Sequence, residues 1–396
     1  MTDRLPLAGI RVLDLTQVQL GPCATQVLGD FGAEIIKVER PGAGDLSRST
    51  DPFIAEPEGQ SAYFMALNRN KRSLAIDLGH SEGRDVVLEL ARQADVLVHN
   101  FRPGVVDRLG LDYAALQEIN PRLIYASGSG FGPEGPLVHK AGQDLLAQSM
   151  SGLASRNAGT DGAAQLFPTA LGDFTAGMIL AQGVLLALYH RERTGRGQSL
   201  HVCLLDTLLA MQQQEATQWM LRRREVNWIT QNLIDIFRTK DGAVTLVGVF
   251  RPNPLQLVCE ALEIEDLSQR PEYATLARQM EHRAQLWQEL GAGFARHTTA
   301  ECVERLDRAD ILCAPVLTLD EALSQPQVQA NQILVSFEHP VHGTVRTTGN
   351  PLHLSGVERI SLNPAPMLGQ HSEEVLRELG FEVAHIARLR EAAVID

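Results

Sequence analysis

Short apolar runs alternate with helical patterns along the first third of the chain. Five runs predict buried β-strands: Arg11–Leu15, Glu34–Glu39, Ser73–Asp77, Asp95–His99 and Leu123–Ser127. Helical patterns separate several of them, as in residues 22–31, where Pro22 stands near the start and Gly32 follows the end. Short buried strands that alternate with helices indicate a parallel sheet with helices on both faces. We therefore predict an α/β fold for this region.

The pattern changes after residue 200. Residues 174–191 and 203–224 read as two long helices, and from about residue 227 a hairpin around Thr239–Gly242 precedes helical segments. Residues 311–316 look like a return segment, 333–345 like strands and 370–379 like a helix that rejoins the first domain. We predict a large domain that begins with residues 1–200, a linker helix at 201–226, a smaller α+β domain at 227–315, and a return linker with the rest of the large domain at 316–396.

Composition and charge narrow the class of protein. The chain has 396 residues, of which 44% are hydrophobic and 21% charged, as in ordinary soluble proteins. Its formal net charge of −13 argues against nucleic acid and anionic membranes as partners. No signal peptide is visible, and the apolar stretch Gly177–Tyr189 is too short to span a bilayer. Five scattered cysteines and twelve histidines without a metal-ligand spacing encode neither a disulfide framework nor a metal site. We expect a cytoplasmic protein without a metal.

The segments after the predicted strands are the places to look for ligands, because open α/β sheets bind them beyond the carboxyl ends of strands. Thr16–Pro22 lacks the G-x-G-x-x-G pattern, which argues against NAD. Gly128–Pro133 is Gly-rich but lacks the Lys-Ser/Thr of a P-loop, so a simple turn and a phosphate cradle both remain open. We expect two or three basic residues near strand ends to converge on a phosphorylated ligand, from the set Arg40, Lys71, Arg72, Arg102, Arg108 and Lys140.

Asp173 is the strongest candidate for chemistry. It lies beside Gly172 at the start of an apolar helix, where free backbone N–H groups and the helix dipole favour an ionised carboxylate. Such a carboxylate can act as a nucleophile toward a carbonyl, although Asp is also a favoured helix cap. Asp144, which follows Gln143, has the same two interpretations: a helix cap or a second carboxylate in the site.

Several segments together resemble the family III CoA-transferases, which include formyl-CoA transferase, carnitine CoA-transferase and α-methylacyl-CoA racemase. The resemblance runs to about residue 210 and resumes near the C-terminus. It is carried by Leu7–Asp14, Gly29–Gly42, Asn68–Ser73, Ala94–Gly104, Leu171–Asp173, Thr194–Gln198 and Leu368–His371. It implies a Rossmann-like large domain, a smaller domain, and a homodimer whose two subunits interlock like rings of a chain.

The resemblance also implies an activity. Asp173 matches the family's aspartate nucleophile, which attacks an acyl-CoA thioester to form a mixed anhydride and then an aspartyl-CoA thioester. Coenzyme A is then a substrate, and neither NAD nor a metal is needed. Gln19, Gln143 and Asp144 are the other candidates for the catalytic region. The candidates for binding CoA are Gln17, Val18, Leu20, Arg40, Leu74, Asn100, Phe101, Arg108 and Leu109, with Lys140 near a family lysine and Arg72 taken from the basic set.

Two departures from the family pattern bear on the reaction. Gln143 stands where the racemase branch has a histidine, and an amide cannot act as an acid or base near pH 7, which favours a transferase. No glycine occurs between Gly197 and Gly242, unlike the glycine-rich loop of formyl-CoA transferase, so formate or oxalate specificity does not follow. We expect a small carboxylic acid as acceptor. A dicarboxylate is a weaker hypothesis, based on Arg251 and the polar residues at 227–232. An acyl-CoA racemase and an inactive acyl-CoA-binding protein remain alternatives.

Overall fold

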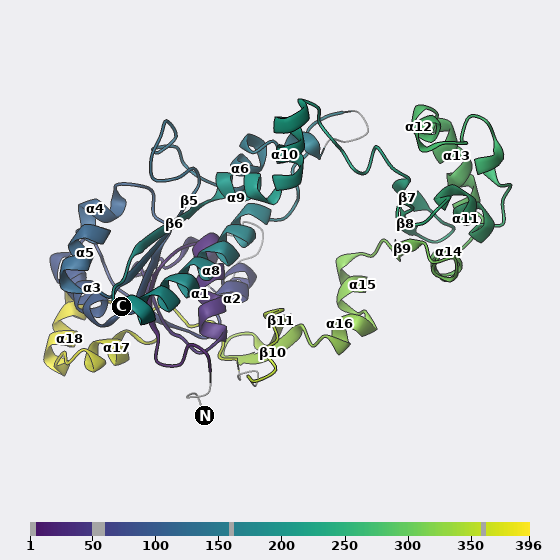
Figure 1. Cartoon of the computed structure of the whole chain (residues 1–396). Helices are drawn as coiled ribbons and strands as arrows, with labels where there is room; N and C mark the ends of the chain where they lie inside the picture. The colour runs from purple at the N-terminus through teal and green to yellow at the C-terminus, as the bar shows by residue number, and fades with distance from the viewer. Residues whose placement is uncertain (1–4, 50–59, 158–161, 358–361) are drawn as a thin grey trace. The chain divides into compact units, whose positions relative to one another are not determined.

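The computed structural model describes residues 5–49, 60–157, 162–357 and 362–396, and the chain divides into two compact units (Figure 1). Unit 1 consists of the residues up to Gln212 together with Gln332–Asp396, and unit 2 consists of Gln213–Asn331. The chain therefore leaves unit 1 once and returns to it once. Each unit contains its own hydrophobic core.

A six-stranded sheet with the order β3-β2-β1-β4-β5-β6 forms the centre of unit 1. Its strands are β1 (Arg11–Leu15), β2 (Glu34–Glu39), β3 (Lys71–Ala75), β4 (Val96–His99), β5 (Ile124–Ser129) and β6 (Ser199–Cys203). All neighbouring pairs are parallel, which confirms the predicted α/β sheet. The strand order reverses between β1 and β4. Such a reversal leaves a crevice at the carboxyl ends of the two strands.

Helices cover both faces of this sheet, because successive strand residues point to opposite sides. Val12 and Leu13 accordingly belong to two different cores. One face packs against α1 (Leu20–Asp30), α8 (Leu171–Thr194) and α9 (Leu204–Met211). The other packs against α3 (Ser81–Gln93), α5 (Tyr113–Ile119), α17 (Ser372–Glu378) and α18 (Val383–Glu391). The C-terminal segment thus completes the core of the first domain, as its apolar pattern predicts.

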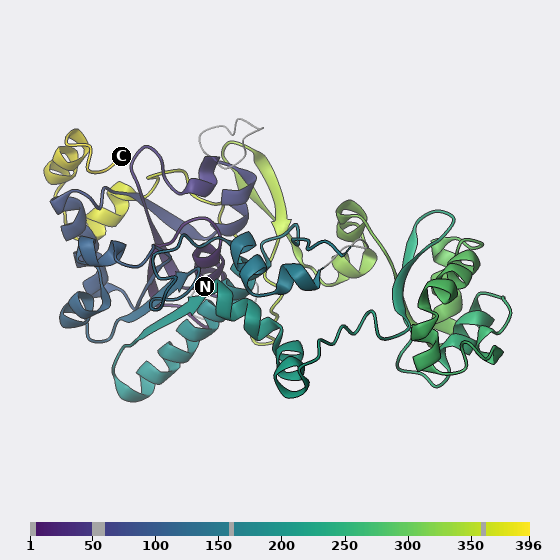
Figure 2. The ribbon, with the colours of Figure 1, turned by 90° about the horizontal axis from the view of Figure 1, so that it is seen from above.

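Helix α8 is the longest helix among the described residues, and Figure 2 shows it running along unit 1. Its length and apolar composition would suffice to cross a membrane. Here it packs along α1 and β5, and Gly177 permits the contact, since a Cβ atom there would stand 2.6 Å from the carbonyl oxygen of Leu20. Core helices of soluble proteins share this composition, so the composition alone does not indicate a membrane span.

Shorter elements complete unit 1. They are the helices α2 (Ala62–Leu67), α4 (Val105–Leu109), α6 (Asp144–Met150) and α7 (Leu153–Arg156), and the antiparallel pair β10 (Leu334–His339) and β11 (Gly343–Thr348). Phe64 of α2 is fully buried and forms a small cluster with Met65 and Ala365, against which Val345 of β11 packs. The strands predicted within residues 333–345 are therefore present and belong to unit 1.

Unit 2 is built around a three-stranded antiparallel sheet with the order β7-β8-β9. The predicted hairpin is confirmed as β7 (Ile234–Arg238) and β8 (Ala243–Val247), and the return segment forms β9 (Leu312–Pro315). The buried side chains of α11 (Pro254–Ala261), α13 (Arg283–Phe294) and α14 (Thr299–Arg308) pack with this sheet. The remaining helices are α10 (Gln213–Arg222), α12 (Leu276–Glu281), α15 (Leu319–Leu323) and α16 (Pro326–Ala330).

One predicted segment is wrong. The expected linker helix at 201–226 contains instead the end of β6, then α9 and α10, which Gln212 separates. β6 lies at the edge of the sheet beside β5, and its side chains alternate between exposed and more buried positions. Such a strand gives no long buried apolar run, so it was not predicted, and its last residues fell within the expected linker helix.

Candidate active site

A pocket of about 430 Å³ lies at the carboxyl ends of β1, β4 and β5, where the strand order reverses. Residues 17–20 after β1, residues 100–105 after β4 and residues 128–132 at the end of β5 supply most of its wall, and Asp173 in the first turn of α8 also lines it. Nine predicted site residues meet here: Gln17, Val18, Gln19, Leu20, Asn100, Phe101, Lys140, Gln143 and Asp173.

Asp173 is half-buried at the pocket wall. Burial raises the pKa of its carboxyl group to about 7, and the nearby charge of Asp144 acts in the same direction. The sequence predicts an ionised carboxylate supported by free N–H groups of the helix terminus. The structure differs, because the N–H group of Asp173 donates to Oδ1 of Asp144 at 3.0 Å. Loss of water and a neighbouring carboxylate therefore outweigh the helix dipole at this position.

Asp144 lies beneath Asp173 and does not line the pocket. It is the first residue of α6 and is 1% exposed. Its Oδ2 accepts a hydrogen bond from Nε2 of Gln148 at 2.6 Å, while its Oδ1 accepts the one from Asp173. A Cβ atom on Gly172 would stand 2.9 Å from Oδ1, so a glycine at this position allows the first turn of α8 to approach so closely. Asp144 therefore positions Asp173 and modulates its charge.

Gln143 lines the pocket but is engaged in helix capping. Its side-chain oxygen accepts a hydrogen bond from the N–H group of Leu145 at 2.9 Å, at the start of α6. This contact fixes the orientation of the amide, and an amide has no titratable proton near pH 7.

The loops after β1 and β4 are tied together at the floor of the pocket. The N–H group of Gln17 donates to Oδ1 of Asn100 at 2.8 Å, and Nδ2 of Asn100 donates to the carbonyl oxygen of Gln17 at 2.7 Å. The next residue, Val18, has a backbone φ of 65°, which is rare for a β-branched side chain. Strained backbone of this kind is concentrated at functional sites.

The candidate basic residues lie in three different places. Arg102 and Lys140 line the pocket, so two of the six candidates converge as expected for a phosphorylated ligand. Lys71 is buried, and its ammonium group pairs with Asp14 at 3.0 Å. Arg40 and Arg108 are exposed and lie outside the set of pocket residues.

Three other predicted CoA contacts lie outside the pocket. The guanidinium group of Arg72 donates to Glu374 at 2.9 Å and to Glu378 at 2.8 Å, so carboxylates from α17 occupy it. Leu74 is fully buried in the sheet core, and Leu109 packs against that same core. For Arg72 and Leu74 the structure indicates structural roles, because strand alternation and packing direct both side chains away from the pocket.

Several pocket residues were not predicted, among them Leu46, Gly142 and Leu204. A Cβ atom on Gly130 would stand 2.4 Å from Cα of Gly142, so two backbone segments meet there without side chains between them. The Gly-rich segment at 128–133 was the available signal, and residues 128–132 of it line the pocket. Within the described ranges, no group of three or more His, Cys, Asp or Glu side chains could hold a metal ion.

Comparison with known proteins places this geometry in a family. The sequence matches CoA-transferase family III over residues 7–372. It is 35% identical over 397 residues to the succinyl-CoA:glutarate CoA-transferase of Mus musculus, covering 99% of this chain and 90% of the relative. It is 33% identical over 419 residues to the formyl-CoA:oxalate CoA-transferase of Rhodopseudomonas palustris (strain BisA53), covering 98% of this chain and 97% of the relative.

The fold agrees with this relationship. The crystal structure of a CaiB/BaiF family protein from Brucella suis matches with a TM-score of 0.85 at 29% sequence identity, over 95% of this chain and 99% of that chain. A carboxylate in a pocket at the reversal of a parallel sheet, an alignment over nearly the full length and relatives above 30% identity lead to one conclusion. The chain belongs to CoA-transferase family III.

Proposed function

We propose that this protein moves CoA from an acyl-CoA donor to a small carboxylic acid, with Asp173 as the nucleophile. The observation that carries the proposal is the half-buried carboxyl group of Asp173 at the pocket wall, held by Asp144. Its raised pKa makes the ionised form a stronger base and therefore a better nucleophile than an ordinary carboxylate. Partial exclusion of water also protects reactive acyl intermediates from hydrolysis.

The proposed reaction passes through covalent intermediates on Asp173. A carboxylate oxygen of Asp173 attacks the thioester carbonyl carbon, the C–S bond breaks, and CoA leaves as a thiolate from a mixed anhydride. The thiolate then attacks the Asp173 carbonyl carbon, which releases the donor acid as a carboxylate and leaves an aspartyl-CoA thioester. The acceptor carboxylate then attacks the aspartyl-CoA carbonyl carbon, which releases CoA thiolate and forms a second mixed anhydride. The thiolate attacks the acceptor's carbonyl carbon, which gives the new acyl-CoA and regenerates the carboxylate of Asp173. The Gln19 amide is our candidate donor to the oxyanions that form at these carbonyl groups.

The pocket offers separate regions for the parts of a CoA thioester. Arg102 and Lys140 provide positive charge for phosphate groups in a chain whose net charge is −13. Phe101 and Leu20 provide apolar surface, and Asn100 holds the loop that carries Gln17. Local cations of this kind are what an acidic protein needs to bind a polyanionic substrate.

We propose a dicarboxylate as the acceptor acid. The relatives of Mus musculus and Rhodopseudomonas palustris are named for glutarate and oxalate, and both acids are dicarboxylates. Arg251, which the sequence offered as a partner for the second carboxylate, lies in unit 2. Its guanidinium group pairs there with Asp310 at 2.8 Å.

A racemase of the same family is the nearest alternative. Gln143 argues against it, since this side chain caps α6 and cannot exchange a proton. A protein that binds acyl-CoA without turnover is the second alternative, and it predicts the same pocket with no covalent intermediate.

We also propose that the protein is a homodimer. The exposed side of α8 carries Phe174, Leu185, Leu186 and Tyr189, of which Leu186 and Tyr189 are 63% and 64% exposed. Large apolar side chains gathered on one helix suit burial in a subunit interface. Interlocked subunits are the arrangement that the family resemblance implies.

The covalent intermediate is the first test. Incubation with succinyl-CoA is expected to add the mass of one CoA less one water to the protein, and hydroxylamine is expected to release the bound CoA. Asp173→Asn, which keeps the shape of the side chain, is expected to give no adduct and to lower turnover by at least about 10³-fold, because the covalent route is lost. Intact mass spectrometry measures the adduct.

Glu118→Gln, an exposed acid in α5, serves as the matched control and is expected to behave like the wild type. Absence of any adduct, together with deuterium uptake at the α-carbon of an acyl-CoA, would move the assignment to a racemase. Tight binding of acyl-CoA with neither result would support the binding protein.

Acceptor preference is the second test. With succinyl-CoA as donor, glutarate is expected to give a kcat/KM at least about tenfold above that of butyrate, since the second carboxylate adds a charge-assisted contact. Steady-state kinetics over a panel of mono- and dicarboxylates measures this ratio. Equal or better use of a long apolar monoacid would contradict the proposal.

Activity is expected to depend on the ionisation of Asp173. Because only the carboxylate is a nucleophile and its pKa is raised to about 7, kcat/KM should increase as the pH rises through about 7 and level off above it. A profile between pH 5 and pH 9 measures the midpoint. A constant kcat/KM across the range from pH 5 to pH 7 would show that Asp173 is already ionised there in the free enzyme.

The oligomeric state is a separate test. Sedimentation at micromolar concentration is expected to give twice the mass of the chain, because the apolar side of α8 is then covered. Leu186→Glu is expected to shift the population toward the monomer. A stable monomer of the wild type would rule out the homodimer and leave the transfer reaction to be judged by its own tests.

A further inference from the structure

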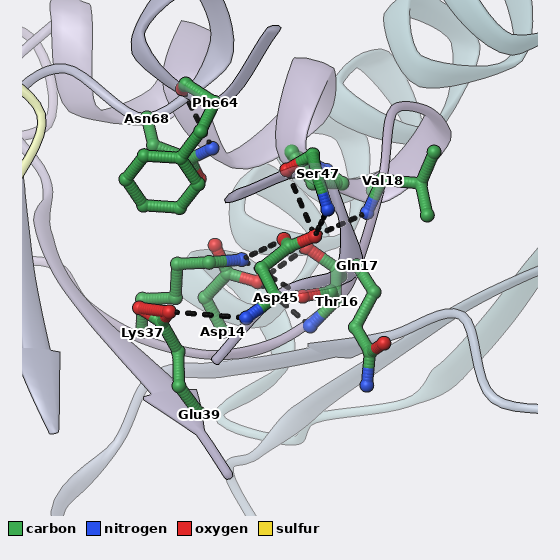
Figure 3. A network of polar contacts seen from close by, with 12 residues as sticks. Asp14, Thr16, Gln17, Val18, Lys37, Glu39, Asp45, Ser47, Phe64 and Asn68 are labelled. Atoms are coloured by element: carbon green, nitrogen blue, oxygen red, sulfur yellow. Dashed lines mark hydrogen bonds and ion pairs between the residues drawn. The ribbon is translucent and has the colours of Figure 1, made fainter. Parts of the chain in front are cut away.

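The loop after β1 rests on a buried ion pair, seen from close by in Figure 3. Nζ of Lys37 lies 2.8 Å from Oδ2 of Asp45, and neither side chain has exposed surface. The ammonium group also donates to the carbonyl oxygen of Thr16 at 2.8 Å. Oδ1 of Asp45 accepts a hydrogen bond from the N–H group of Val18 at 3.0 Å. The pair therefore holds the loop on both sides of Gln17.

Val18 is the residue for which such a support matters. A φ of 65° places a β-branched side chain in the left-handed region, where its Cβ substituents crowd the backbone. An unsupported valine would return to negative φ, and the direction of the chain into α1 would change. The bond from its N–H group to Asp45 opposes that return.

Burial of two charged side chains is unfavourable in free energy, because both lose their contacts with water. Removal of both ions from water costs more than a matched apolar pair would, unless the geometry of the pair does something that apolar groups cannot. Here each ion has a second partner on the pocket loop, and Asp45 is itself fixed by the N–H group of Ser47 at 2.8 Å. The directed contacts to Thr16 and Val18 are what an apolar pair would lose.

We propose that the Lys37–Asp45 ion pair positions the pocket loop for catalysis by holding Val18 in its left-handed conformation. Both residues act through the loop and lie outside the set of pocket-lining residues, so they are positioning residues. The inference rests on the proposed transfer reaction at Asp173, because the loop supplies Gln17 and Gln19 to the same pocket.

Asp45→Asn tests the proposal because an amide cannot make both sets of contacts. Asp45 uses one oxygen for Lys37 and the other for Val18, whereas an amide presents its NH2 group on one of those two sides. A small misplacement of a reacting group lowers the reaction rate by up to about 100-fold. The kcat with succinyl-CoA and glutarate is therefore expected to fall about 10- to 100-fold. The KM for succinyl-CoA is expected to change less than kcat, because Arg102 and Lys140 lie outside this loop.

A second substitution separates positioning from general support of the fold. Glycine adopts a positive φ without crowding, so Val18→Gly should make the support unnecessary. The double variant Asp45→Asn with Val18→Gly is therefore expected to recover most of the lost kcat, to within about fivefold of Val18→Gly alone. If Asp45 only stabilises the fold, the two losses multiply and no recovery occurs, which would overturn the proposal.

Asp30→Asn is the matched control. Asp30 forms a buried ion pair with Arg69 at the other end of α1 and touches neither the loop nor the pocket. It is expected to lower the melting temperature and leave kcat unchanged. A loss of kcat in this control equal to that of Asp45→Asn would show that any buried charge has the same effect and would overturn the proposal.

The conformation of Val18 can be tested in a chain that keeps the ion pair, in case Asp45→Asn does not fold. Val18→Gly permits the left-handed conformation, while Val18→Pro fixes φ near −65° and removes the N–H group. We expect Val18→Pro to lose at least about tenfold more kcat than Val18→Gly, because only the glycine can keep the left-handed conformation. Equal losses in two folded variants would overturn the inference. Inactivity of the wild type with every donor would instead refute the proposed function.

Discussion

Buried charge on the neighbouring strands β1, β2 and β3 is the constraint on which the site depends. Asp14, Lys37 and Lys71 are each in a strand of the sheet and at most 3% exposed, and burial of single ions would cost several kcal/mol apiece. They are stable only as a connected set. Lys71 pairs with Asp14, and Lys37 lies close enough to lower the pKa of Asp14 further. Although burial opposes it, the pKa of Lys37 is raised by the carboxylates of Asp45 and Asp14.

This set of charges determines the shape of the backbone above it. Asp14 accepts hydrogen bonds from the N–H group of Thr16 at 2.9 Å and from the hydroxyl of Thr25 at 2.7 Å, so the end of β1 and the second turn of α1 are fixed to one carboxylate. A strand, a loop and a helix thereby keep a constant relation. Asp144 and Asp173 are arranged differently, since Asp144 is buried and accepts hydrogen bonds from Gln148 and from the N–H group of Asp173, whereas Asp173 lines the pocket.

Local sequence patterns predicted the sheet well but were weaker for the site. β1 and β2 match the predicted segments because buried parallel strands are short and rich in apolar residues, and Asp173 lies in the first turn of α8, where a helix start is visible in sequence. Arg72, predicted as a CoA contact, lies on the opposite face of β3 from Lys71, because adjacent strand residues point to opposite faces. Lys71 faces Asp14 under α1, whereas Arg72 meets the acidic residues of α17. Register and side-chain direction of this kind come from tertiary pairing.

Local sequence also does not show the tertiary contacts that set the pKa of Asp173 or those that support the loop after β1. The pKa of Asp173 depends on Asp144, which lies 29 positions earlier in the chain and approaches only because of Gly172. Asp45 comes after β2, and the sequence around it does not indicate its hydrogen bond with Val18. Neither contact leaves a periodic signal.

The pair of hydrogen bonds between Gln17 and Asn100 has a mechanical consequence. One amide side chain bonds both the N–H group and the carbonyl oxygen of a loop residue, as a neighbouring strand would. The side chain thus stands in for a peptide group and adds one more rung to the β1–β4 ladder beyond its last backbone pair, Leu15 with His99. The backbone at the floor of the crevice is therefore held as rigidly as the sheet. The side chains on it belong to loop residues, so their identity can vary without loss of this rigidity.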